Sequence, residues 1–243
     1  LSDLQRTHDE IQDWLFGHIC YDHKNVLEPK LKSIHSVKSG FADIAFFRPA
    51  TVIHINRAQT VLSIESFGRP DDIFCQVTET KTLPTRNPIP KLRFRSVVDR
   101  GAYLKTIAQL RKHISDGDCY EINFCCEGFC NDADISPLDV FNELNTLSPA
   151  PFAAFYKAKD DYLMCASPER YLRRSGTTIM TQPIKGTAAR GASAELDELY
   201  RTQLQNSIKE RAENVMIVDL VRNDLSRCCE TGSIKVDDLF GIH

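Results

Sequence analysis

Lys185 stands in the stretch TQPIKGTAARG, between a Pro-Ile pair and a Gly-Thr pair. An amine in that place could be a surface charge, a phosphate ligand or a nucleophile. A phosphate-binding loop places a glycine before the lysine and leads into a helix, and the order Lys-Gly-Thr does not match that pattern. Spacing alone therefore favours a solvated lysine after a strand, because a nucleophilic role requires partial burial that favours the neutral amine.

Glu210 and Glu213 stand at the head of the apolar segment 215–221, which is predicted to form a buried helix. Residues three apart share one helix face, so the two carboxylates should lie side by side. Mg²⁺ is a suitable counterion, because it binds one or two carboxylates and keeps waters. The alternative is that the helix dipole favours acids at this end, with Lys209 and Arg211 as neighbours. The sequence leaves both interpretations open.

Apolar periodicity predicts the elements that must position these residues. The mixed order of helices and strands favours an α+β fold over regular βαβ winding. The polar, proline-bearing stretch 78–96 is the best internal boundary, giving an N-terminal portion 1–96 and a core 97–243 that carries the motifs. Helices are expected over 4–15, 100–115 (capped by Asp99), 136–147 and about 194–228, and strands over 16–22, 41–66, 119–129, 150–172, 177–186 and 232–240.

Composition narrows the class of protein. A chain of 243 residues suits one large domain or two small ones. A net charge of −3 gives no field that would attract nucleic acid or an anionic membrane, and no apolar run approaches the roughly 20 residues of a membrane span. Nine cysteines, an odd number, indicate reduced thiols and a cytoplasmic location rather than a disulfide framework.

Several motifs occur together in one order. They are WLFGHICYD, DGDCYEINF, SPAPFAAFY, CASPERYL, TQPIKGTAARG and KERAENVMIVDLVRNDLSRCCETGSIKV. This order resembles the chorismate-utilising enzymes, and within them the p-aminobenzoate branch, component I of aminodeoxychorismate synthase. The resemblance covers nearly the whole chain, from about residue 14 to 240. It implies an α+β fold of large, mostly antiparallel sheets packed with outer helices.

The resemblance also implies a chemistry for individual residues. In anthranilate synthases the corresponding motif is similar to PIAGT, whereas this chain has PIKGT. In the p-aminobenzoate branch the lysine is proposed to attack C2 of chorismate before ammonia adds at C4, so Lys185 would be the nucleophile. Gly186, Thr187 and Glu121 would contact substrate, and Glu210 with Glu213 would hold Mg²⁺. Glutamate is a departure at position 121, where relatives in this branch often carry glutamine.

The expected activity is Mg²⁺-dependent amination of chorismate to 4-amino-4-deoxychorismate in folate biosynthesis. A glutamine amidotransferase subunit would supply the ammonia. Two alternatives remain: an anthranilate or isochorismate synthase, and a non-catalytic fragment of the family core. Members of the family continue past LFGIH with further active-site segments, so we expect this chain to be part of a longer enzyme and to be inactive alone.

Overall fold

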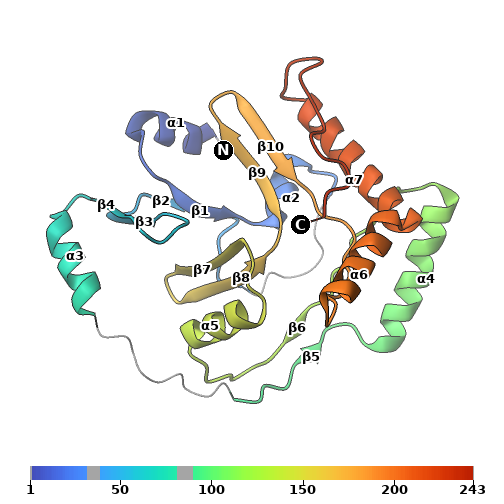
Figure 1. Ribbon diagram of the computed structural model, residues 1–243, viewed down its shortest axis with the longest axis horizontal. Coiled ribbons are helices and arrows are strands. Elements are labelled where there is room, and N and C mark those ends of the chain that lie inside the picture. Colours follow the sequence, from blue (N-terminus) through green and yellow to red (C-terminus); the bar gives the residue numbers. More distant parts are fainter. Residues whose placement is uncertain (1, 32–38, 81–89, 243) are drawn as a thin grey trace. The chain divides into compact units, whose positions relative to one another are not determined.

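The computed structural model describes residues 2–31, 39–80 and 90–242 (Figure 1). The chain forms two compact units, and each unit is made of two separate stretches of the sequence. Unit 1 comprises Leu1–Val140 and Tyr156–Leu163, and unit 2 comprises Phe141–Phe155 and Met164–His243.

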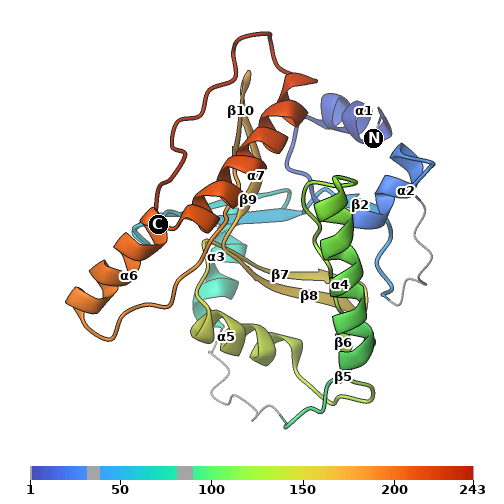
Figure 2. The same cartoon turned by 90° about the vertical axis from the view of Figure 1, so that its right-hand side faces the viewer.

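Unit 1 is built from short antiparallel strand pairs and helices. β1 pairs with β2, β3 with β4, and β5 with β6, all antiparallel. Figure 2 shows α4 as one uninterrupted helix. The elements are α1 (Ser2–Ile11), β1 (Phe16–Ile19), the 3-10 helix η1 (Tyr21–His23), α2 (Lys24–Leu27), β2 (Ile44–Phe47), β3 (Thr51–Ile55), β4 (Leu62–Ser66), α3 (Pro70–Glu79), β5 (Arg95–Ser96), α4 (Arg100–Asp116) and β6 (Gly128–Phe129).

Aromatic side chains pack together over the β1–β2 pair of unit 1. The ring of Tyr156 lies 5.4 Å from that of His18, 6.0 Å from that of Phe41 and 6.5 Å from that of Phe47. His18 Nε2 lies 2.9 Å from the carbonyl oxygen of Ala42, which can only accept, so this nitrogen carries the proton. In the neutral ring Nδ1 then accepts from the Tyr156 hydroxyl at 3.1 Å. The polar ends of these rings are thus satisfied while their faces pack.

Unit 2 carries the longer strands and the helices around Lys185. β9 and β10 form an antiparallel hairpin, and α6 leads into α7 through the single residue Ser207 (Figure 1). α5 and the β7–β8 hairpin run through both units. The elements are α5 (Pro137–Leu147), β7 (Phe152–Ala158), β8 (Asp161–Ser167), β9 (Arg170–Ser175), β10 (Thr178–Gln182), α6 (Ala194–Asn206) and α7 (Ile208–Ser226).

The α+β class and the antiparallel pairing expected from the sequence are confirmed. The strands of the described part pair two by two, and wider sheets would require pairing between these ladders, which does not occur among the described residues. The cap of α4 is also confirmed, because the Asp99 side chain accepts from the Ala102 amide at 2.8 Å. The division into portions 1–96 and 97–243 stays a prediction, and part of the expected loop, residues 81–89, lies outside the described residues.

One predicted strand is wrong and another is wrong over most of its length. Of the predicted strand 119–129, only the last two residues form a strand, β6; residues 119–127 are irregular, although their side chains alternate, because β-pairing also needs a partner strand and none pairs with them in the described part. Residues 232–240 are irregular as well and lie along α7 instead. There the Asn214 side chain donates to the Leu239 carbonyl, and the Arg211 guanidinium lies 3.8 Å from the centre of the Phe240 ring.

The prediction that α7 is buried is also wrong. Val215 and Leu220 are 46% and 54% exposed, and no described residue of the chain is fully buried. The apolar residues of α7 are consecutive in the sequence, so they are distributed around the helix and do not form one apolar face. Packing against α6 can therefore cover only some of them. Over the described residues, the chain has no helix with the length and apolarity required to span a bilayer.

Candidate active site

Lys185 lies in unit 2, three residues after β10 ends. The segment 183–191 that follows the strand has no regular structure, and it is called the motif loop here. Lys185 and Gly186 are half-buried, whereas Thr187 is exposed. Spacing alone favours a fully solvated lysine, whereas the observed partial burial of Lys185 is what a functional lysine requires.

Gly186 brings the motif loop against Glu210. Its φ of +79° lies in the left-handed region that disfavours side chains. A Cβ added at this position would lie 2.8 Å from Glu210 Oε2 and 3.2 Å from Glu210 Cβ. The backbone next to Lys185 therefore packs directly on a carboxylate of the predicted metal site, and only glycine fits there without a shift.

The start of α7 fixes where Glu210 stands. Ser207 is the N-cap, and its hydroxyl accepts from the Glu210 amide at 3.3 Å. Serine is favoured at this position because it satisfies an amide that has no partner within the helix. Glu210 is thus held in the first turn by the cap, while Glu213 follows one turn later on the same face.

The two carboxylates converge on one cation. Lys209 Nζ lies 3.2 Å from Glu210 Oε1 and 3.4 Å from Glu213 Oε1. The hydrogen bond to Glu210 is the main cause of the raised pKa of Lys209, and the charges of both glutamates add to it. The side chain of Glu210 is 23% exposed and that of Glu213 is 40% exposed, so both remain within reach of solvent and solute cations.

The donor set can be compared with what Mg²⁺ requires. No cluster of three or more His, Cys, Asp or Glu side chains suited to a metal ion occurs within 2–31, 39–80 and 90–242. Mg²⁺ does not need such a cluster, because it is commonly bound by one or two carboxylates and retains several waters. A carboxylate pair that already converges on an ammonium group fits this requirement, and Glu210 and Glu213 would be the ligands.

Glu121 belongs to the other unit. It is half-buried in the irregular segment between α4 and β6, in unit 1. Lys185, Gly186, Thr187, Glu210 and Glu213 all lie in unit 2. The structure therefore groups five of the six predicted site residues in one unit, and among these it brings Gly186, Glu210 and Glu213 close together.

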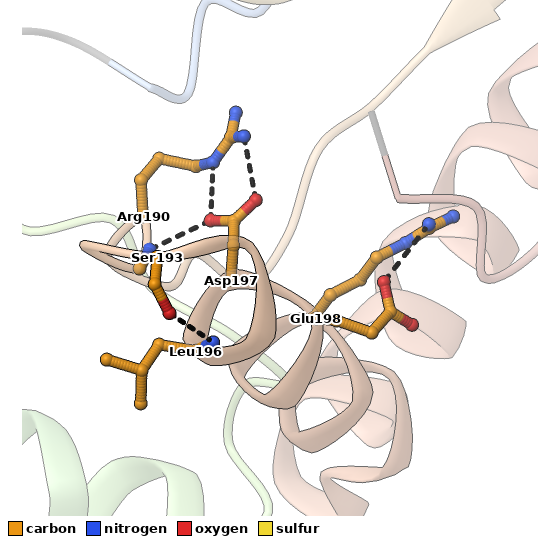
Figure 3. A network of polar contacts seen from close by, with 7 residues as sticks. Arg190, Ser193, Leu196, Asp197 and Glu198 are labelled. Carbon is orange, nitrogen blue, oxygen red and sulfur yellow. Dashed lines mark hydrogen bonds and ion pairs between the residues drawn. The ribbon is translucent and has the colours of Figure 1, made fainter.

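Asp197 is a feature that the sequence analysis missed. It lies in the first turn of α6, and both of its carboxylate oxygens bind the motif loop (Figure 3). Oδ1 accepts from Arg190 Nε at 2.7 Å and from the Gly191 amide at 2.8 Å, while Oδ2 accepts from Arg190 Nη2 at 2.7 Å. The hydrogen bond with Arg190 is the main cause of the lowered pKa of Asp197. The sequence signal for this contact was an Arg-Gly pair shortly before the capping serine Ser193, with an aspartate four residues after that serine.

A cavity of about 300 Å³ lies beside the same loop. Two small residues of the motif loop form one side, and α6 and the start of α7 form the other. Its lining includes Glu210, a residue of the predicted metal site. The lining residues are Ala188, Ala189, Tyr200, Gln203, Leu204, Ser207 and Glu210.

Comparison with known proteins assigns the family of this chain. A family model described as chorismate binding enzyme matches residues 2–243. The chain belongs to that family. The resemblance seen in the sequence motifs is thereby confirmed.

Individual relatives include two branches of the family. Aminodeoxychorismate synthase component 1 of Klebsiella aerogenes is 39% identical over 147 residues, covering 60% of this chain and 32% of that protein. Anthranilate synthase component 1 of Saccharomyces cerevisiae is 32% identical over 249 residues, covering 93% of this chain and 48% of that protein.

A solved structure shows the same fold. The crystal structure of anthranilate synthase component I from Streptococcus pneumoniae matches with a TM-score of 0.77 and 23% identity, covering 92% of this chain and 52% of that one. The expected fold is thus confirmed. Where the match extends over nearly the whole chain, this chain spans about half the length of its relatives.

Proposed function

We propose that the protein containing this chain is component I of an aminodeoxychorismate synthase. It converts chorismate and ammonia to 4-amino-4-deoxychorismate, a step toward p-aminobenzoate and folate. The observation that carries the proposal is the packing of Gly186 on the Glu210 carboxylate, because it joins the lysine motif and the acidic pair into one site. The PIKGT motif supports this branch over anthranilate synthases, which resemble PIAGT there.

In the proposed reaction Lys185 is the nucleophile. Its neutral Nζ forms a bond to C2 of the ring, the two conjugated double bonds shift, and the C4–O bond breaks. The hydroxyl leaves as water after taking up a proton. Ammonia then bonds to C4, the double bonds shift back, and Nζ leaves C2. The proton that ammonia loses balances the proton that the hydroxyl gained, so chorismate and ammonia give the amino product and water.

Other residues of this chain bind and orient the substrate in this proposal. Glu210 and Glu213 hold Mg²⁺, which when bound withdraws electron density from the ring through the C1 carboxylate. The Thr187 hydroxyl and the Glu121 carboxylate are offered as polar contacts to chorismate. Gly186 leaves the space that Glu210 requires. A glutamine amidotransferase subunit is proposed as the partner that supplies ammonia, and the name component 1 borne by the Klebsiella relative supports a second subunit.

The test uses the full-length protein with chorismate, Mg²⁺ and ammonium. The expected product is one that a lyase converts to p-aminobenzoate. The Lys185→Ala variant should lose nearly all turnover, whereas Lys235→Ala, an exposed lysine in another irregular segment of unit 2, should retain it. Anthranilate fluorescence in place of p-aminobenzoate would contradict the proposal and favour the anthranilate branch. Absence of any turnover by the wild-type protein would favour a non-catalytic role.

A further inference from the structure

We propose that Asp197 is a positioning residue for the reaction assigned to Lys185. Together with Arg190 and Gly191 it forms a hydrogen-bonded cluster, called the clamp here, which holds the motif loop on the first turn of α6 (Figure 3). This inference rests on the proposed function for its catalytic consequence. Its structural part, that the clamp fixes the loop, does not depend on which reaction the protein performs.

The clamp has the geometry of a strong polar contact. Arg190 donates two parallel N–H bonds to the two oxygens of Asp197, both at 2.7 Å. Such paired, charge-assisted bonds fix orientation as well as distance. The Gly191 amide adds a third bond at 2.8 Å, so the carboxylate binds the backbone of the loop and not only a side chain.

Close packing at Gly191 limits the loop further. A Cβ added to Gly191 would clash with the Asp197 amide nitrogen, so the two backbones are in direct contact. The position of that turn is itself fixed, because the Ser193 hydroxyl accepts from the Leu196 amide as the N-cap of α6. Loop and helix therefore meet at a place where neither can move without breaking bonds.

The motif loop is consequently held at two points on either side of Thr187. Gly186 rests on Glu210 of α7, and Gly191 rests on Asp197 of α6. Ser207 joins these two helices directly. The segment between the two points supplies Ala188 and Ala189 to the wall of the cavity that Glu210 also lines. Releasing the clamp should therefore displace the loop that carries Lys185 relative to Glu210.

The exposure of the pair argues against a role in global stability. The side chain of Arg190 is 89% exposed and that of Asp197 is 31% exposed. Ion pairs in contact with solvent contribute little to the free energy of unfolding. The third bond, to a loop amide, has a local effect that such a pair alone would not have. Loss of the clamp should thus lower turnover much more than the unfolding temperature.

The test compares Asp197→Ala with Glu198→Ala in the full-length protein. Glu198 is the next residue of α6 and forms an exposed ion pair with Arg201 at 3.8 Å, so it is a matched control (Figure 3). We expect Asp197→Ala to lower kcat by about 10- to 100-fold, as small misplacements of reacting groups do, with a smaller change in KM. Asp197→Asn keeps an acceptor for the Gly191 amide and should lie between wild type and Asp197→Ala.

Amide hydrogen exchange of the peptide containing residues 183–191 provides a readout independent of activity. Exchange should be faster in Asp197→Ala than in wild type and unchanged in Glu198→Ala. Equal exchange in the two variants would overturn the clamp, as would a kcat within twofold of an active wild type. If the wild-type protein does not aminate chorismate but exchange still rises in Asp197→Ala, the proposed function is refuted and the structural part of the clamp stands.

Discussion

Replacing Gly186 with alanine tests the contact between the motif loop and the acidic helix. The residue has a φ of +79°, and a side chain in this left-handed region costs roughly 1–2 kcal/mol of the free energy of unfolding. The new Cβ would lie 2.8 Å from Glu210 Oε2, about 0.6 Å short of the 3.4 Å at which ordinary contact begins. The 3.2 Å approach to Glu210 Cβ means that rotation of the carboxylate alone cannot relieve the contact. Because a displacement of about 1 Å can cost about 100-fold in rate, we expect a loss of roughly tenfold or more.

Gly232→Ala is the matched control for this variant. Gly232 has a φ of +82° with no heavy atom within 4 Å of the added Cβ, so it shares the backbone cost without the contact. Both variants should lose stability in thermal unfolding of the full-length protein through the shared backbone cost, and Gly186→Ala should lose at least as much as Gly232→Ala because of the added contact. Only Gly186→Ala should lower the rate of chorismate amination and raise the Mg²⁺ concentration for half-maximal rate. Equal rates and equal Mg²⁺ dependence in the two variants would refute the role given to the Gly186–Glu210 contact.

Three further predictions concern the same unit. Lys209→Met removes the ammonium that lies between Glu210 and Glu213, so the Mg²⁺ concentration for half-maximal activity should fall roughly two- to fivefold, the equivalent of an exposed ion pair; an increase in a Mg²⁺ titration would contradict this. Ser207→Ala removes the N-cap of α7 and should lower the free energy of unfolding by about 1 kcal/mol in denaturant titrations, with a weaker Mg²⁺ response; unchanged values would count against the cap. The lowered pKa of Asp197 means that its ionised form stabilises the fold above the ordinary value of 3.8, and that this contribution disappears as the pH falls through the lower folded value. Because the exposed pair contributes little to the free energy of unfolding, the difference between wild type and Asp197→Asn should be small at pH 7 and should shrink further toward pH 3; a difference that grows as the pH falls would show that the clamp is not responsible.

The elements of the fold were predictable where local signals decide them. Asp99 before an apolar stripe gave the start of α4, and the break between α6 and α7 at Ser207 falls inside the predicted helical region. Strand formation depends in addition on a partner far along the chain, which local alternation does not contain. For that reason residues 119–126 and 232–240 have a strand-like sequence but an irregular backbone.

The residues of the site were predictable as types, but their contacts were not. Glu210 and Glu213 could be placed on one helix face from their spacing. The approach of Gly186 to Glu210 depends on how the loop after β10 turns, and a single glycine in the sequence does not specify that turn. Burial was overestimated for α7, because an apolar run indicates surface that could be covered and not what covers it. The clamp was missed because Arg190 and Asp197 each have an ordinary explanation as surface charges.

The most direct test of the central claim is a search for the Lys185 adduct. The full-length protein would be mixed with chorismate and Mg²⁺ without ammonia, quenched in acid, digested and examined by mass spectrometry. We expect the peptide that contains Lys185 to gain the mass of chorismate less one water, and the Lys185→Ala protein to show no such gain. A Lys185→Ala enzyme that aminates chorismate with ammonia at the wild-type rate would contradict the account.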